Sequence, residues 1–336
     1  MTDSLPSTMR AAQFDSYGGP DRLEVRSVPV PRPGPDELLV RVRATSVNKG
    51  ELVLLRGGVR VLAGRAFPKG VGSDFSGTVA AFGSGAPGFR VGDAVWGLLP
   101  GLRMVRSAAT TATAAEYVVV GRADVHPLPG GIDLADAASL PVVGPTALRA
   151  VAAAAIAPGE RVLVRGAAGG VGSVLVQLAA AAGGEVTALV RPDGDAFVRG
   201  LGAAHVADYR TTEPGHLPES DVILDAVGSH LPAFRRRLSA RGRMVTVAAE
   251  PLARGLVSIA LSAVHGSRRI RFSQHDPTAE DFVRLSAAVT AGRIRPTIGA
   301  RYPLARIRDG YAASARGGVP GKILIDVVPE DGSPSA

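Results

Sequence analysis

The spacing of apolar residues changes along this chain. Between residues 8 and 128, short runs such as LEVRSV, ELLVRVRA and AEYVVV are separated by Gly and Pro. Alternation with a period of two residues, bounded by turn residues, is typical of β-strands. The first part of the chain is therefore predicted to be rich in strands.

From residue 161 the pattern alternates apolar strands with helical stretches. The predicted strands are RVLVRG, EVTALV, HVADY, DVILDAV and RMVTVA, and a helix is expected over 170–182. Such alternation indicates βαβ units on a parallel sheet, as in a Rossmann domain. A further helix is expected over 278–291, because Phe282, Leu285, Ala288 and Val289 share one face.

The segment GKILIDV at 321–327 returns to a strand pattern and is expected to rejoin the first domain. We therefore predict an α/β chain in three segments. A β-rich domain covers 1–128, a doubly wound parallel-sheet domain covers 129–293, and 294–336 returns to the first domain.

Composition narrows the possible functions of these domains. The chain has 336 residues and no cysteine, which excludes disulfides, thiolate nucleophiles and cysteine-ligated zinc sites. Its net charge of +8 comes mainly from arginine, and the clusters 235–237 and 268–271 lack an aromatic platform of the kind that binds single-stranded nucleic acid. We expect a solvated surface, with no nucleic-acid partner.

The sequence also bears on location. The alanine-rich run 150–157 is too short to span a bilayer, and the first ten residues lack the apolar core of a signal peptide. The expectation is a soluble cytoplasmic protein without a membrane partner.

A glycine-rich run, RVLVRGAAGGVGSV at 161–174, carries the main candidate chemistry. Gly166, Gly169 and Gly172 follow a predicted strand and precede a predicted helix. This arrangement directs a helix N-terminus at a dinucleotide pyrophosphate. The alternative is a structural turn in a glycine-rich chain.

The end of the second predicted strand bears on which dinucleotide binds. An acidic residue there would favour NAD, whereas a nearby arginine accommodates the 2′-phosphate of NADP. Arg191 stands there, with Asp193 two residues later. The sequence favours NADPH, and the alternative is that Arg191 is a surface residue beside a turn.

Several collinear motifs resemble the medium-chain dehydrogenase/reductase superfamily, and within it the zinc-free quinone oxidoreductase group related to zeta-crystallin. They include VRVRATSVNKGE at 40–51, GSDFSGTVAAFGSGAPGFRVGDAVWG at 72–97, GERVLVRGAAGGVGS at 159–173 and DVILDAVG at 221–228. The resemblance implies a GroES-like catalytic domain beside the Rossmann domain. It also implies a homodimer formed by pairing edge strands, for which 256–272 is the candidate segment.

The resemblance further implies positions for the cofactor. Asn48 and Thr146 would flank the nicotinamide, and Arg191 with Tyr209 would lie near the adenosine phosphate. The other implied cofactor residues are Ala168, Gly169, Gly170, Val171, Ala226, Val227, Ala248, Phe272 and Ser273. Alternatives remain for Asn48 as a cap, Tyr209 as strand-end packing and Phe272 as core.

Zinc-dependent relatives use cysteine ligands and a His-Glu pair near the position of Ser73-Asp74, so no metal site is expected here. Many quinone oxidoreductases carry Asn-x-x-Asp-x-Tyr, whereas residues 48–53 read NKGELV, with Val53 in place of the tyrosine. Asn48 and Lys49 are the remaining catalytic candidates, and water is the alternative proton donor.

These observations predict an NADPH-dependent, zinc-independent reductase that transfers hydride to a quinone or an α,β-unsaturated carbonyl. Segments 53–70 and 98–113 mix aliphatic and arginine residues, which suits a bulky, partly apolar small molecule. By analogy of composition, this substrate would be a polyketide-type intermediate of secondary metabolism. The alternatives are a non-redox cyclisation or elimination in a cofactor-binding relative, and a redox-silent binding protein.

Overall fold

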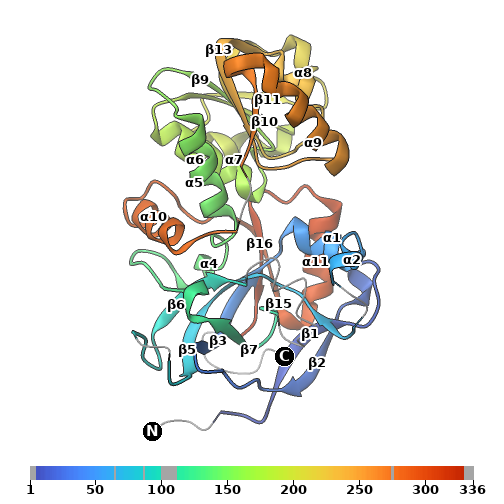
Figure 1. The fold of residues 1–336 in the computed structure, drawn as a ribbon, viewed down its shortest axis with the longest axis vertical. Coiled ribbons are helices and arrows are strands. Elements are labelled where there is room, and N and C mark those ends of the chain that lie inside the picture. The colour runs from blue at the N-terminus through green and yellow to red at the C-terminus, as the bar shows by residue number, and fades with distance from the viewer. Residues whose placement is uncertain (1–4, 64–65, 86–87, 100–111, 274–275, 329–336) are drawn as a thin grey trace. The chain divides into compact units, whose positions relative to one another are not determined.

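A computed structural model describes residues 5–63, 66–85, 88–99, 112–273 and 276–328 (Figure 1). The chain divides into two compact units. The β-rich unit comprises residues 1–142, 276–286 and 298–336, and the parallel-sheet unit comprises residues 143–275 and 287–297.

The β-rich unit is built on a seven-stranded sheet with the order β15-β16-β3-β5-β6-β8, and β7 pairs with β3 outside this path. The last strand of the chain, β16, therefore lies inside the sheet, antiparallel to β3 and parallel to β15. The strands are β3 (Glu37–Ser46), β5 (Asp74–Phe82), β6 (Ala94–Leu98), β7 (Tyr117–Gly121), β8 (Val125–Pro127), β15 (Ile298–Pro303) and β16 (Lys322–Asp326).

A second, three-stranded sheet in this unit has the order β2-β1-β4. Its strands are β1 (Thr8–Phe14), β2 (Glu24–Pro29) and β4 (Lys69–Gly70). Among its described residues the unit contains the helices α1 (Lys49–Leu55), α2 (Arg60–Ala63), α4 (Leu134–Ala137) and α11 (Ile307–Arg316), together with the first part of α10 (Ala279–Thr290).

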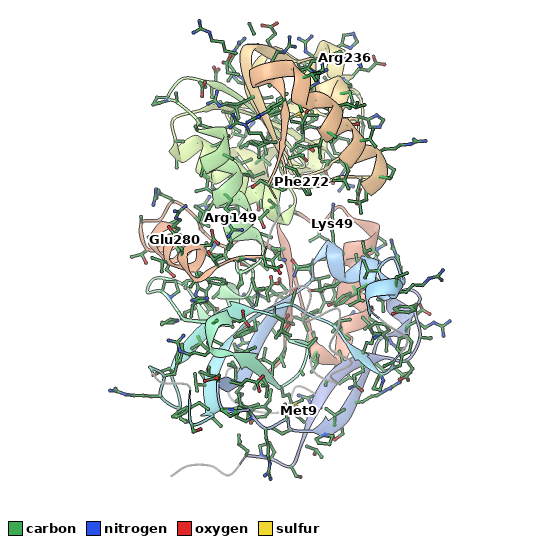
Figure 2. All side chains as sticks on the ribbon, viewed as in Figure 1. Met9, Lys49, Arg149, Arg236, Phe272 and Glu280 are labelled. Carbon is green, nitrogen blue, oxygen red and sulfur yellow. The ribbon has the colours of Figure 1, made fainter. Side chains whose placement is uncertain are left out.

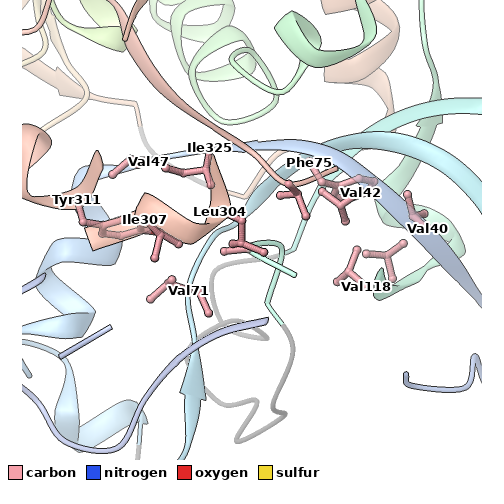
Figure 3. Packing of buried hydrophobic residues seen from close by; sticks show 14 of the residues in the cluster. Val40, Val42, Val47, Val71, Phe75, Val118, Leu304, Ile307, Tyr311 and Ile325 are labelled. Carbon is pink, nitrogen blue, oxygen red and sulfur yellow. The ribbon is translucent and has the colours of Figure 1, made fainter. Parts of the chain in front are cut away.

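The core of the β-rich unit joins residues from both ends of the chain. Val42 and Phe75 come from β3 and β5, whereas Ile307 and Tyr311 come from α11 (Figure 3). Each is at most 1% exposed. Because α11 contributes to this core, the C-terminal segment is an integral part of the first domain.

The parallel-sheet unit contains six strands in the order β11-β10-β9-β12-β13-β14. Every neighbouring pair is parallel. The strands are β9 (Arg161–Arg165), β10 (Glu185–Val190), β11 (His205–Asp208), β12 (Ser220–Asp225), β13 (Leu238–Thr246) and β14 (Ile270–Phe272). The helices are α5 (Val143–Ala154), α6 (Gly170–Ala181), α7 (Asp195–Arg199), α8 (Leu231–Arg235) and α9 (Leu252–Leu261).

The helix expected over 278–291 is α10 (Ala279–Thr290). Phe282, Leu285, Ala288 and Val289 are all buried, which confirms the periodicity argument.

The segment 256–272 differs from the edge strand expected there. Its first part belongs to α9, a 3-10 segment covers Ser262–Arg268, and only Ile270–Phe272 forms a strand. Alanine and leucine have high helix propensity, and the run LVSIALSA carries them at helical spacing.

The architecture confirms the predicted fold class. A β-rich domain is combined with a doubly wound parallel-sheet domain of the Rossmann type.

Candidate functional site

The carboxyl ends of all six parallel strands meet at one edge of their sheet, where ligands bind in folds of this kind. The glycine loop follows β9 at this edge and leads directly into α6. Gly166 has φ +70°, a conformation that favours glycine. A Cβ added to Gly172 would lie 2.0 Å from the carbonyl oxygen of Gly166, so the loop packs against α6 without room for a side chain.

The start of α6 has no side-chain cap, because Gly169 occupies the N-cap position. A helix N-terminus combines backbone N–H donors with the positive end of the helix dipole. Gly169 is exposed, and Ala168, Gly170 and Val171 are half-buried. This backbone fits a dinucleotide pyrophosphate, because phosphate oxygens accept hydrogen bonds from N–H groups.

Two arginines lie where the neighbouring strands β10 and β11 end. Arg191 follows β10 and pairs with Asp193 at 2.9 Å, with its side chain one-third exposed. Arg210 follows β11 and pairs with Asp208 at 3.3 Å. A hydrogen bond to Asp208 is the main cause that raises the pKa of Arg210, and the charge of Asp193 adds to the increase. Tyr209, between the two strand ends, is 53% exposed.

The remaining predicted cofactor residues of this unit also follow strand ends, except Thr146. Ala226 and Val227 follow β12, Ala248 follows β13, and Phe272 with Ser273 ends β14 (Figure 2). Thr146 lies in α5, half-buried. The structure thus gathers most of the predicted cofactor residues at one edge of one sheet.

Asn48 belongs to the β-rich unit, where it is the N-cap residue of α1 in a capping box with Glu51. Its Nδ2 donates to Asp74 Oδ1 at 2.7 Å, and Ser73 Oγ and Glu51 Oε1 each lie 3.1 Å from the same nitrogen. Lys322 Nζ donates to Asn48 Oδ1 at 2.6 Å. Both ends of the Asn48 amide are therefore engaged by its own unit.

This network contains two fully buried carboxyl groups and one buried ammonium. Lys322 Nζ lies 3.6 Å from Asp74 Oδ2. Glu51 Oε2 accepts a hydrogen bond from Tyr311 Oη at 2.6 Å. Burial, followed by the charge of Asp74, raises the pKa of Glu51 above its ordinary value. Burial also raises the pKa of Tyr311 well above its ordinary value, so its phenol stays protonated and donates the hydrogen bond to Glu51.

Lys49, the other catalytic candidate, is the exposed first residue of α1 (Figure 2). Val53, which stands where the motif would have tyrosine, is 46% exposed on the same helix. The functional roles of Asn48 and Lys49 remain predictions, as do those of the cofactor residues.

Sequence reasoning missed the connections among the buried polar residues. Tyr311 and Lys322 reach Asn48 and Glu51 across 260 or more residues of sequence. One signal was available, since Lys322 directly precedes the apolar run Ile323–Ile325 in the strand KILID. A charged residue in an apolar strand requires a buried partner.

Comparison with known proteins places this architecture in a family. Residues 34–130 match the alcohol dehydrogenase GroES-like domain, and residues 201–325 match the zinc-binding dehydrogenase domain. The chain is 32% identical to the chloroplast envelope quinone oxidoreductase homolog of Arabidopsis thaliana, over 95% of this chain and 98% of that protein. The chain belongs to the medium-chain dehydrogenase/reductase superfamily.

Other relatives place this superfamily member among quinone oxidoreductase homologues. It is 29% identical to the Homo sapiens quinone oxidoreductase, over 94% of this chain and 97% of that protein. The structure of the quinone oxidoreductase from Coxiella burnetii aligns with a TM-score of 0.85 at 28% identity, covering 95% of this chain and 99% of that one. A cobalt- and zinc-bound alcohol dehydrogenase from Pyrobaculum aerophilum aligns with a TM-score of 0.81 at 31% identity, covering 95% and 100%.

Because some members of the superfamily bind zinc, the donor atoms of the Asn48 network must be tested against that metal. Protein zinc sites are built from cysteine, histidine and carboxylate ligands. The chain has no cysteine, and Asn48 and Ser73 contribute an amide and a hydroxyl. The ammonium of Lys322 already supplies the positive charge between Asn48 and Asp74. These residues do not fit a zinc site.

The part of the chain that the structure describes contains neither a membrane-spanning helix nor a cluster of metal-ligating side chains. Within these residues, no helix is both long and apolar enough to cross a lipid bilayer. No group of three or more His, Cys, Asp or Glu side chains in this part of the chain is arranged to hold a metal ion.

Proposed function

We propose that this protein is an NADPH-dependent, zinc-independent reductase of quinones or α,β-unsaturated carbonyls. The observation that carries the proposal is the glycine loop, where Gly166 and Gly172 approach so closely that only hydrogen fits between them. This backbone precedes an uncapped helix N-terminus at the carboxyl edge of a parallel sheet. Relatives named as NAD(P)H oxidoreductases and quinone oxidoreductases support the same assignment.

The preference for NADPH rests on the charges at the ends of β10 and β11. Arg191 follows β10 and Arg210 follows β11, and the exposed Tyr209 directly follows β11. A 2′-phosphate would compete with Asp193 for Arg191, because phosphate offers more charge and more acceptor oxygens than one carboxylate. NADH lacks this group and would leave the Arg191–Asp193 pair unchanged.

The bound nicotinamide would supply a hydride to the acceptor. Residues of the β-rich unit would provide charge and hydrogen bonds to the acceptor and to the nicotinamide. Lys49 is exposed at the start of α1 and is proposed to polarise the acceptor carbonyl. Asn48, fixed by Lys322 and Asp74, would border the nicotinamide. The proposed acceptor is a bulky, largely apolar small molecule, such as a polyketide-type intermediate.

Arg191→Ala tests the cofactor assignment directly. We expect calorimetric titration to give a dissociation constant for NADPH that rises about tenfold or more, because one charge-assisted pair to phosphate contributes about 1.5–3 kcal/mol. The dissociation constant for NADH should stay within about twofold of the wild-type value. Arg199→Ala is the control, since Arg199 is likewise partly exposed and paired with an aspartate in the same unit.

The acceptor class is tested by NADPH consumption with simple quinones and enones. Lys49→Met should lower kcat with these acceptors and leave NADPH binding unchanged. Absence of binding of either nucleotide to the wild-type protein would overturn the oxidoreductase proposal. It would favour the redox-silent binding alternative.

A second candidate function is a non-redox step on a biosynthetic intermediate, such as cyclisation or elimination. It is favoured by Val53, which is exposed on α1 where the motif of many quinone oxidoreductases has a tyrosine. Turnover of an intermediate without loss of NADPH absorbance would support this candidate. Oxidation of NADPH in step with turnover would exclude it.

We also propose that the protein forms a homodimer through the end of the parallel sheet at β14. This strand closes the sheet order, and the adjoining helix α9 has a wide exposed apolar face. The exposed apolar side chains are Leu252, Leu256, Val257 and Leu261 on α9 and Val264 in the 3-10 segment that follows it. Apolar surface of this kind favours burial against a second copy.

A cytoplasmic location remains a prediction, because the names of the relatives include chloroplastic and mitochondrial proteins.

A further inference from the structure

The strands β9 and β12 are neighbours at the centre of the parallel sheet. The strands that follow each of them along the chain are added on opposite sides of the sheet. After β9 the chain adds β10 and β11 on one side, and after β12 it adds β13 and β14 on the other. In open parallel sheets the ligand crevice lies outside the carboxyl ends of the strands at this point. Arg165 and Asp225 are the final residues of these two strands and face each other in register.

These two residues form a buried ion pair between the carboxyl ends of β9 and β12, where the order of the strands reverses. Arg165 Nη1 lies 2.6 Å from Asp225 Oδ1, and the side chains are 5% and 0% exposed. The guanidinium carbon of Arg165 also lies 3.5 Å from the ring centroid of Phe234. The pair is therefore held from one side by an aromatic ring and is removed from water.

Asp225 connects this pair to the segment that follows β12. Its carboxylate accepts hydrogen bonds from the backbone N–H groups of Val227 at 3.2 Å and Gly228 at 2.9 Å. It also accepts one from Thr246 Oγ1, at the end of β13, at 2.7 Å. One carboxylate thus links the ends of three neighbouring strands and fixes the course of 226–228.

The segment 226–228 in turn borders the glycine loop. Ala226 N–H donates to the Arg165 carbonyl at 3.2 Å. A Cβ added at Gly166 would lie 3.0 Å from Val227 Cγ2. A shift of 226–228 would therefore alter the space beside the glycine loop.

Stability alone does not account for this pair. A buried ion pair loses so much hydration that apolar residues of similar volume are often equally or more stabilising. Arg165 bears part of this loss, since its Nε has no hydrogen-bond partner in the part of the chain that the structure describes. The pair instead specifies one arrangement of the strand ends.

We propose that Arg165 and Asp225 are positioning residues for the nicotinamide half of the dinucleotide. This inference rests on the proposed function, which puts the adenosine phosphate at β10 and the pyrophosphate at β9. The order of the strands along this edge is β10, β9, β12 and β13, so the strand ends that follow the pyrophosphate position are those of β12 and β13. These are the ends that Asp225 and Thr246 hold together.

The test is the double variant Arg165→Met with Asp225→Leu, which removes both charges at similar volume. Calorimetric titration would measure NADPH and 2′,5′-ADP, a fragment that carries only the adenosine half. We expect the affinity for NADPH to fall about tenfold or more and that for 2′,5′-ADP to stay within about twofold of wild type. The thermal unfolding midpoint should fall, because the N–H groups of Val227 and Gly228 and the Thr246 hydroxyl lose their acceptor, but the variant should stay folded at the temperature of the titration.

The same two strands supply a matched control at their opposite ends. Arg161 and Asp221 form an ion pair between β9 and β12 at 3.1 Å, at the amino edge of the sheet. Arg161→Met with Asp221→Leu makes the same chemical change away from the proposed cofactor. This control variant should bind both ligands as the wild type does.

Wild-type affinity for NADPH in the Arg165/Asp225 double variant would overturn the inference. Equal weakening of NADPH and 2′,5′-ADP would also overturn it, because a loss of general structure would then explain the result. If the double variant fails to fold, Thr246→Val replaces it, and it should weaken NADPH selectively by removing one donor to Asp225. Failure of the wild-type protein to bind either ligand would instead refute the proposed function itself.

Discussion

Replacing Gly172 by alanine tests the close packing between the glycine loop and α6. The added Cβ would lie 2.0 Å from the Gly166 carbonyl oxygen and 2.6 Å from its carbon. Ordinary van der Waals contact begins at 3.4 Å, so the first of these distances has to increase by 1.4 Å. Both atoms belong to the backbone, and no side-chain rotation can relieve the clash.

The structure sets the size of the expected effect. Overpacking a close-packed site costs about 1–3 kcal/mol. The movement also strains the hydrogen bond from Gly169 N–H to Gly166 O, at 2.9 Å, which contributes about 1 kcal/mol. We expect Gly172→Ala to lower the free energy of unfolding by about 2–4 kcal/mol. Its dissociation constant for NADPH should rise at least about tenfold.

The assay is urea unfolding followed by circular dichroism, with NADPH binding measured by calorimetry. Gly215→Ala is the control, because a Cβ at Gly215 would meet nothing within 4 Å and the same unit carries it. Equal unfolding midpoints and equal NADPH affinities for the two variants would refute the reasoning about the loop.

Three further predictions concern pH and assembly. Burial raises the pKa of Glu51. The contribution of Glu51 to stability is therefore full below about pH 4.5 and is lost as the pH rises through the raised pKa. Urea unfolding at a series of pH values should show this loss in the wild type and not in Glu51→Gln. Burial, with the charge of Arg122, lowers the pKa of His126 to about 4, so stability should fall by about 1–2 kcal/mol between pH 6.5 and 4, after allowance for the partly exposed ring. His126→Phe should retain the stack on Phe282 and lose this dependence, and an unchanged pH profile would contradict the assignment. Leu256→Glu with Leu261→Glu should halve the mass found by sedimentation equilibrium, whereas a wild-type protein that is already monomeric would exclude the dimer.

The spacing of apolar residues predicted individual helices and strands, because that signal lies within each element. The helix α10 followed from four apolar residues at helical spacing, and the strands β9 and β12 followed from short apolar runs. These signals require only that one face of each element be buried. They were sufficient for the fold class.

Contacts between distant segments could not be predicted in the same way. Tyr311 hydrogen-bonds Glu51 across 260 residues, and Lys322 reaches Asn48 across 274. Sequence reasoning had treated Asn48 as a residue bordering the cofactor or capping a turn. Its amide also belongs to a buried polar network, and Lys322 joins that network only when β16 enters the sheet.

The interior position of β16 determines when each unit can be completed during protein synthesis. The last residue of the parallel-sheet unit is 297, so this unit can close before the final segment of the chain has been made. The β-rich unit cannot, because β16 pairs with β3, and Tyr311 and Ile325 fill its core. Domains usually fold in order from the N-terminus as the chain emerges from the ribosome. Of these two units, the β-rich one is begun before the parallel-sheet unit and completed after it, because its core lacks α11 and β16 until they have been synthesised.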